Sequence, residues 1–367
     1  MTIESLFNEL IQLSPFLNEN VCIVNRQPRS LEELEKASLR DFVASCHVML
    51  PSKLYKYFPN RWIVDQNVPR NYSLEALIKN TVFLQHPSKF DDIFDSRMHV
   101  DRDLYKSSLI RYLCNFFLKA SYKEYSTNKD ALIEYLKNYD ENLLEIGNEI
   151  EIDDSIEILD QQYLLNFFYS IEYFIRNGLS CDDALEKFLE EKYNQKNSEL
   201  QDILGVSCFT TSPFMNNMWS NSYANCHEGF CIEYSVEYSD DLRDMWEHTY
   251  PMIYCNHRPD NTLKIVAKEH QRIDEEYLKC VLTHGVLRKS IEWVLQDEWR
   301  LCLPLNMYGQ VVKFFPISKV FIGPRMNKQN RYELINICKQ RKIDAFDIRY
   351  RNDSFRLEAI PIESDSE

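Results

Sequence analysis

Glycine is scarce in this chain, which has seven glycines among 367 residues. None of them belongs to a GxxxxGK[ST] or a GxGxxG pattern. Loops that cradle phosphate groups with backbone amides need glycine, because the chain must approach the anion closely. The sequence therefore excludes a P-loop and a Rossmann-type turn, and a nucleotide ligand would have to be held by side chains.

Several other features are missing. No apolar run approaches the roughly 20 residues of a membrane span, and MTIESLFNEL lacks the basic region and apolar run of a signal peptide. The eleven cysteines include no CxxC pair. We therefore expect a cytoplasmic protein with no membrane partner, whose cysteines are mostly small buried hydrophobic residues in a reducing compartment.

The sequence also disfavours a metal site and a catalytic thiol, because the residues that such sites need do not occur at suitable spacing. Cys226, His227 and Cys231 are close in sequence, but a structural zinc site needs a second ligand pair, which is absent. Adjacent side chains diverge, so His227 is poorly placed to activate Cys226, and Cys208 lies in an apolar segment. No metal is expected. Asp91, Asp92 and Asp95 could serve a metal-dependent nuclease, but a loop cap explains them equally well.

Charge is unevenly distributed along the chain. The net charge of -15 argues against a general nucleic-acid coat, whose surface should be positive. Residues 138–160 carry nine acidic and no basic side chains, whereas residues 323–351 carry eight basic and three acidic ones. The C-terminal segment could therefore bind an RNA or DNA phosphate backbone, or it could be a solvated helix face.

The order of apolar patterns predicts an α+β fold. Residues 1–50 are predicted to form an N-terminal helical segment, and residues 51–360 a single α+β domain with a helical insertion at about 101–200. An acidic tail follows at 361–367. Strands and helices alternate irregularly, which favours a mixed or antiparallel β core over a doubly wound parallel sheet.

Two strand segments carry candidate functional groups. In QDEWRLC, Glu298 and Arg300 are two residues apart and share one strand face, while Trp299 points the other way into the core. The pair is either a structural ion pair or a catalytic carboxylate kept ionised by a cation. In LYKY, Tyr55 and Tyr57 share a face that is either core or the wall of a cleft.

Four segments in order resemble a known family. They are LYKYF, VFLQHPSKFDDIFDS, LGVSCFTTSPFMNNMWSNSYANCHEGFCIEY and LRKSIEWVLQDEWRL. Their order and residue types resemble domain-of-unknown-function family 2971, a bacterial family, over about residues 53–325 outside the helical insertion. The chain departs from the family pattern at FDDIFD, where members have FNDPFE, and at Gln296, where the first Glu of ExEWR is usual.

The motif order is in turn similar to that of ADP-ribosyltransferases, in particular phage-defence toxins of toxin–antitoxin–chaperone systems. That resemblance implies an ADP-ribosyltransferase-like β core that uses NAD as substrate and modifies a nucleic acid, with RNA favoured, or a protein. It also implies an antitoxin or chaperone partner. The implied roles are Glu298 as the catalytic carboxylate, Tyr55 and Lys56 on the ribose or phosphates, Trp219, Ser220 and Tyr223 around the nicotinamide, and His227 and Arg300 on phosphate or Glu298.

A second reading of the same residues stays open. The aromatic pocket could hold a small ligand without chemistry, and the helical insertion with its acidic patch could dock a protein partner. The chain would then be a non-catalytic sensor or binding module.

Overall fold

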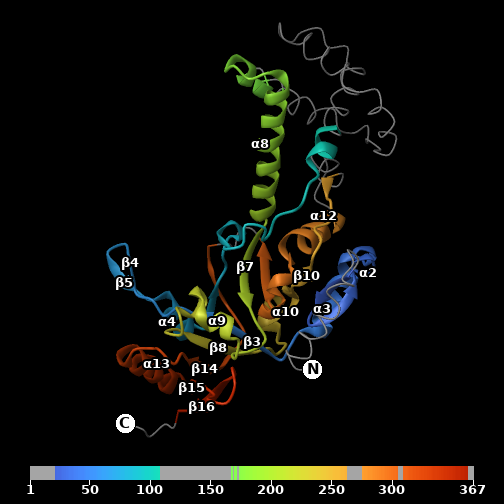
Figure 1. The fold of residues 1–367 in the computed structure, drawn as a ribbon. Coiled ribbons are helices and arrows are strands. Elements are labelled where there is room, and N and C mark those ends of the chain that lie inside the picture. The colour runs from blue at the N-terminus through green and yellow to red at the C-terminus, as the bar shows by residue number, and fades with distance from the viewer. Residues whose placement is uncertain are drawn as a thin grey trace. The chain divides into compact units, whose positions relative to one another are not determined.

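The computed structural model describes residues 21–107, 167, 169–171, 173–262, 275–304 and 309–362. The chain forms two compact units, and each is treated by itself. The first unit comprises residues 1–96, 201–257 and 286–367, and the second comprises residues 97–200 and 258–285. Helices and mixed sheets occur together, so the predicted α+β class is confirmed (Figure 1). The second unit includes the predicted helical insertion at about 101–200, and the single domain over 51–360 stays a prediction.

A five-stranded sheet, in the order β16-β15-β14-β8-β3, forms the base of the first unit. All its pairs are antiparallel except β14 with β15, which are parallel and joined by helix α13. A parallel pair needs such a crossover, because its second strand must start at the same end. The bounds are β3 Lys53–Phe58, β8 Phe230–Ser235, β14 Ile317–Ile322, α13 Lys328–Arg341, β15 Asp344–Tyr350 and β16 Leu357–Pro361.

A second, antiparallel sheet carries the residues around Glu298. Its order is β7-β12-β9, with bounds β7 Leu204–Phe209, β12 Trp299–Pro304 and β9 Thr249–Pro251. Tyr55 of β3 exchanges two 2.8 Å backbone hydrogen bonds with Thr210, just beyond β7, and so ties the two sheets together. Between them Phe209 stacks on Phe314, with ring centroids 4.4 Å apart, inside a large apolar core.

The N-terminal segment corrects a prediction. Residues 21–30 form a hairpin of β1 Val21–Val24 and β2 Gln27–Ser30, not a helix, and β1 pairs with β10 Ile253–Cys255. VCIV is a short apolar run that suits a strand, and Asn25 and Arg26 adopt the left-handed φ of 47° and 61° that a two-residue hairpin turn requires. Residues 1–20 of the predicted helical segment lie outside the described residues.

The predicted helices follow this hairpin. Ser30 caps α2 Leu31–Lys36 by accepting a 3.3 Å bond from the Glu33 backbone N–H. Helix α3 then spans Leu39–Met49. The four-stranded sheet that contains the hairpin has the order β11-β10-β1-β2, with β11 at Arg288–Ser290. This sheet matters for the site because β11 carries Lys289.

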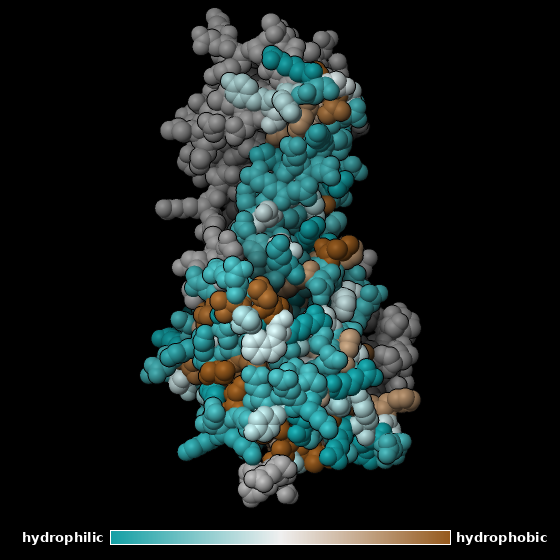
Figure 2. Space-filling view, turned by 90° about the vertical axis from the view of Figure 1, so that its left-hand side faces the viewer, coloured by the Kyte–Doolittle hydropathy of each residue, from teal (hydrophilic) through white to brown (hydrophobic). Residues whose placement is uncertain are grey.

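Short elements complete the first unit. The hairpin of β4 and β5 exposes Trp62, Ile63, Val64 and Val68. Hydrophobic residues also form separate patches within the mainly hydrophilic face shown in Figure 2. The remaining bounds are β4 Ile63–Asp65, β5 Val68–Arg70, α4 Tyr72–Lys79, β6 Thr81–Phe83, η1 Pro87–Lys89, α9 Asn216–Ser220, η4 Ser222–Ala224, η5 Asp240–Leu242, α10 Arg243–Glu247, η7 Ile291–Gln296 and β13 Val311–Lys313.

The second unit is mainly helical over its described residues, apart from an isolated bridge between His99 and Asp260. Helix α8 runs over Cys181–Gln201, α12 over Glu275–Cys280, and a π-helical turn, η6, over Val281–Val286. Ser180 precedes α8 and accepts a 3.1 Å bond from the Asp183 backbone N–H. Residues 108–166 of the predicted insertion and 363–367 of the predicted tail lie outside the described residues. Within the described ranges, no helix has the length and apolarity needed to span a membrane.

Glycine is required at two positions, Gly229 and Gly323, where backbone segments approach each other closely. Gly229 is the one glycine of residues 218–234, the segment that runs from α9 through η4 into β8. A Cβ on Gly229 would collide with the Phe58 and Ala224 carbonyl groups, and one on Gly323 would collide with the carbonyl oxygens of His227 and Gly229. The Gly323 N–H also donates a 2.9 Å bond to the Gly229 carbonyl. The lone glycine of that segment therefore serves a close backbone approach between β3, β8 and β14.

Gly323→Ala is accordingly expected to lower the free energy of unfolding by about 3 kcal/mol, the upper end of the usual range for overpacking, because backbone carbonyls cannot move aside cheaply. Gly285→Ala is the control, since its Cβ would meet Met98 Cγ at an ordinary 3.4 Å. We expect that control to change stability by less than about 1 kcal/mol. Equal urea midpoints for the two variants would contradict the expectation.

Candidate functional site

A buried network of four charged side chains lies at the start of β12. The Arg300 guanidinium donates to both oxygens of Asp95, at 2.8 and 2.6 Å, and its Nε donates to Glu298 Oε1 at 2.6 Å. Lys289 Nζ donates to Glu298 Oε2 at 2.8 Å. All four residues are at least nine-tenths buried. Two anions and two cations balance, as a buried charge cluster requires.

The sequence positions this network through three elements. Arg300 of β12 and Glu298, which directly precedes β12, point to the same side, and Trp299 between them is fully buried on the other, as predicted. Asp297 ends η7 in a left-handed conformation with φ of 44°, which turns the chain into the strand. Asp95 comes from the loop after η1 and Lys289 from β11. Glu298 and Arg300 therefore form the ion pair that both interpretations of the sequence require, within a larger network.

The network fixes the ionisation of Glu298. Burial alone would raise the pKa of its carboxyl, but Arg300 and Lys289 outweigh burial and hold that pKa well below its usual range. Burial would lower the pKa of the Lys289 ammonium, and Glu298 with Asp95 raises it above its usual value. Glu298 is therefore a carboxylate at any physiological pH.

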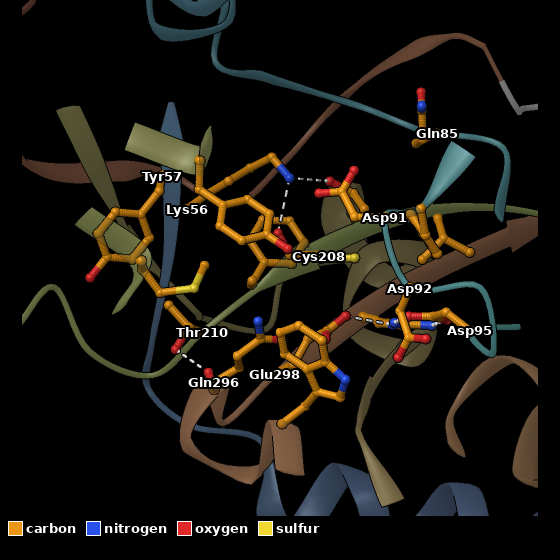
Figure 3. Close-up of a pocket in the computed structure, with 18 of the residues that line it drawn as sticks. Lys56, Tyr57, Gln85, Asp91, Asp92, Asp95, Cys208, Thr210, Gln296 and Glu298 are labelled. Atoms are coloured by element: carbon orange, nitrogen blue, oxygen red, sulfur yellow. Dashed lines mark hydrogen bonds and ion pairs between the residues drawn. The ribbon is translucent and has the colours of Figure 1, made fainter. Parts of the chain in front are cut away.

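Glu298 and Arg300 line a cavity of about 320 Å³, within the range of small-molecule sites (Figure 3). Three more predicted site residues reach the same cavity, namely Tyr55 and Lys56 from β3 and Tyr223 from η4. With Asp95 from the loop after η1, residues from four separate segments of the sequence meet at one place. The other lining residues used below are Phe83, Lys89, Phe90, Asp91, Asp92, Asp95, Lys289, Trp293 and Gln296.

Lys56 is a cation at the wall of this cavity. Its Nζ donates to Ser207 Oγ at 3.1 Å and to the Cys208 carbonyl at 2.9 Å, and it lies 5.1 Å from the centre of the Phe209 ring. Burial lowers the pKa of this ammonium, against an opposing effect of Cys208 and Glu298. Both of these acceptors are neutral oxygens, so the protonated ammonium could also pair with an anionic ligand.

Aromatic rings line the opening. Tyr223, Trp293 and Phe83 are 36, 37 and 46% exposed although all three line the cavity. Phe90 packs deeper, with its ring 4.9 Å from the Arg300 guanidinium carbon. Part-exposed rings around a cavity suit a flat ligand, because each exposed face offers stacking area.

The hydroxyl of Tyr55 is hydrogen-bonded to a second buried carboxylate, that of Glu233. This hydroxyl donates to Glu233 Oε2 at 2.8 Å, and burial followed by this bond raises the pKa of the phenol far above its usual value. Ser318 donates to the other oxygen of Glu233 at 2.7 Å, and Lys53 lies 3.6 Å from it. Tyr55 is therefore a rigid neutral wall rather than a proton donor for the ligand.

Three predicted site residues lie elsewhere. Trp219 is fully buried against Tyr57, with ring centroids 5.1 Å apart, and its indole N–H donates to the Pro213 carbonyl at 2.7 Å. Ser220 is exposed and bonds the Asn217 carbonyl at 3.3 Å. Neither lines the cavity. The short helix α9 turns Trp219 into the core, so Trp219 and Ser220 do not share the cavity of the other predicted site residues.

His227 is also outside the cavity lining. It sits in a left-handed turn, with φ of 73°, and its ring lies 6.0 Å from that of Tyr350. Burial and then the charge of Arg325 lower the pKa of its imidazole. Glu298 is held by Arg300 and Lys289, and the predicted contact of His227 with phosphate or Glu298 stays a prediction.

Lys289, Trp293 and Gln296 were not predicted as site residues, and Asp95 was considered only as part of a nuclease metal site or a loop cap, so four residues were missed. All four lie inside segments quoted for the family resemblance, which was the available signal. Gln296 accepts a 2.9 Å bond from Lys289, so the departure from ExEWR leaves the network intact. Asp91 and Asp92 line the cavity while Asp95 binds Arg300. Among the residues that the structure describes, no group of acidic, His or Cys side chains could hold a metal ion.

Comparison with known proteins bears on part of this region. Residues 218–301 match the model of a family described as a protein of unknown function, DUF2971. The matched range contains Tyr223, Lys289, Glu298 and Arg300. No curated protein and no solved structure matches the chain.

Proposed function

We propose that this protein is an NAD-dependent ADP-ribosyltransferase. The observation that carries the proposal is the meeting of Tyr55, Lys56, Tyr223, Glu298 and Arg300 in one cavity, with Glu298 held ionised. A mixed α+β fold and a ligand site built without a glycine-rich loop are compatible with it.

The chemistry follows from the cavity wall. Cleavage of the nicotinamide–ribose bond builds an oxocarbenium-like centre, as in glycoside hydrolysis. The Glu298 carboxylate would stabilise that positive charge and accept a bond from a ribose hydroxyl. Tyr223 and Trp293 would stack on the nicotinamide, and Lys56 would pair with the diphosphate. Nicotinamide leaves with the electrons of the bond to the ribose carbon. The acceptor nucleophile then forms a bond to that carbon and releases its proton to solvent.

The acceptor is proposed to be a nucleic acid, with RNA favoured, or a protein. The basic segment 323–351 is the candidate contact surface, since it offers the exposed Tyr332 for stacking. Arg331 of the same segment pairs with Asp347 at 2.6 Å, which uses part of its positive charge. An effector of anti-phage defence with an antitoxin or chaperone partner is the proposed setting.

A non-catalytic ligand-binding module is the second candidate. It is favoured by the charge balance of the network, because Arg300 and Lys289 each hold one oxygen of Glu298 and weaken its field at a developing cation. In that case the cavity would bind a flat anionic ligand unchanged.

Titration of NAD into the wild type tests NAD binding, which the proposed transferase activity requires. Lys56→Met is expected to weaken binding by about tenfold to a hundredfold, because a hydrogen bond to a charged group contributes about 1.5–3 kcal/mol. Lys319→Met is the matched control, since Lys319 is also half-buried beside an aromatic ring, Phe346, but does not line the cavity. Absence of NAD binding to folded wild type would overturn the proposed function.

A further inference from the structure

A serine, a histidine and an aspartate lie in a hydrogen-bonded line in the first unit, and none of them lines the cavity. Ser88 Oγ is 2.7 Å from His86 Nδ1, and His86 Nε2 is 2.7 Å from Asp202 Oδ1. His86 and Ser88 come from the turn that leads into and forms η1, and Asp202 follows the end of α8. Segments 116 residues apart therefore meet at this imidazole.

The partners determine which nitrogen of His86 carries the proton. An ionised carboxylate only accepts hydrogen bonds, so Nε2 is the protonated nitrogen and donates to Asp202. Nδ1 then has a lone pair and accepts from the Ser88 hydroxyl. This is the polarity in which a histidine acts as general base toward a serine and a carboxylate holds its tautomer.

The hydroxyl is also accessible. Ser88 is exposed, and the side chains of His86 and Asp202 are 19 and 50% exposed. Lys89, also exposed, follows Ser88 directly and adds a positive charge to the same turn. An electrophile can therefore reach Ser88 Oγ from solvent without opening the fold.

We propose that Ser88, His86 and Asp202 form a nucleophilic site that attacks carboxylic esters. Ser88 Oγ bonds to the carbonyl carbon as its proton passes to His86 Nδ1. The bond from that carbon to the alcohol oxygen then breaks, and the leaving alcohol takes the proton from Nδ1. Water repeats the sequence on the acyl-serine and restores the free hydroxyl. This activity does not depend on NAD cleavage.

His86 also has a structural role as the N-cap of η1, and the test must distinguish that role from action as a general base. The Ser88 backbone N–H also donates to His86 Nδ1, at 3.2 Å, so His86 is the N-cap of η1. His86→Asn separates the two roles, because asparagine is a good N-cap residue but cannot act as a base. Ser38 provides a reference inside the same chain, since it is a capping serine hydrogen-bonded to Asp41 with no histidine in its cap.

The test uses a fluorophosphonate probe on the full chain, with labelled peptides identified by mass spectrometry. The probe forms an Oγ–P bond and releases fluoride. Ser88 is expected to label far faster than Ser38, and His86→Asn to slow Ser88 labelling by on the order of 100-fold. Asp202→Asn should also slow it while the melting temperature stays near that of the wild type. Ser88 labelling at the Ser38 rate, or at the wild-type rate in His86→Asn, would overturn the proposal.

Discussion

Glu298→Gln is expected to reduce NAD cleavage by on the order of 100- to 1,000-fold, the usual loss when one electrostatic group aimed at developing charge is removed. Glutamine keeps the size of the side chain but removes the negative charge that would face the oxocarbenium-like centre. The measurement is nicotinamide release in a single turnover, with saturating enzyme, so that weak binding does not hide the chemical step.

The control addresses stability. Glu298→Gln leaves Asp95 as the one anion of the network against Arg300 and Lys289, so the variant is expected to lose stability as well. Combining it with Lys289→Met restores a neutral network of one anion and one cation. The double variant should regain stability without regaining activity. Wild-type turnover by a folded Glu298→Gln protein would remove Glu298 from the proposed mechanism.

Arg300→Met is expected to lower the free energy of unfolding by about 3–5 kcal/mol, the usual effect of removing one partner from a buried ion pair. Arg300 makes both hydrogen bonds to Asp95 and one to Glu298, so its loss strands two buried carboxylates near a single Lys289. Urea denaturation checks the value. Arg331→Met, which removes a half-exposed bidentate pair with Asp347, should cost less than about 1 kcal/mol. Equal losses in the two variants would contradict the dominant role of the network.

The pH dependence of that stability difference has a defined sign. In the wild type the pKa of Glu298 is depressed, so its contribution to stability is full above the pKa of an unfolded glutamate, about 4.3. It is lost as the pH falls below that value toward the depressed folded pKa. Without Arg300 the folded pKa rises, so the variant loses less on acidification. The stability gap between the two proteins should therefore narrow below about pH 4.

The sequence predicted the parts of this site that local geometry determines. Two-residue spacing places Glu298 and Arg300 together and Trp299 opposite, whatever the rest of the fold does. It could not predict the direct contact between Asp95 and Arg300, because the two residues are 205 positions apart in the sequence. Such a pairing depends on how the η1 loop packs against β12, which no local pattern encodes.

The other differences between the expected and the observed positions have a similar origin. Tryptophan suits a ligand pocket and a core equally well, and only the direction of α9 decides that Trp219 is core while Tyr223, four residues later, faces the cavity. The short apolar run VCIV fits a helix or a strand, and pairing with β10 decides it. The α+β class was predictable because it depends on many segments together.

Transfer of label from NAD tests the central claim most directly. Wild-type protein is incubated with NAD labelled in the ADP-ribose moiety, together with separate pools of RNA, DNA and cell lysate protein. The proposed function predicts nicotinamide release and label on one of these acceptors. Folded wild-type protein that binds NAD yet releases no nicotinamide and labels no pool would contradict it and favour the ligand-binding module.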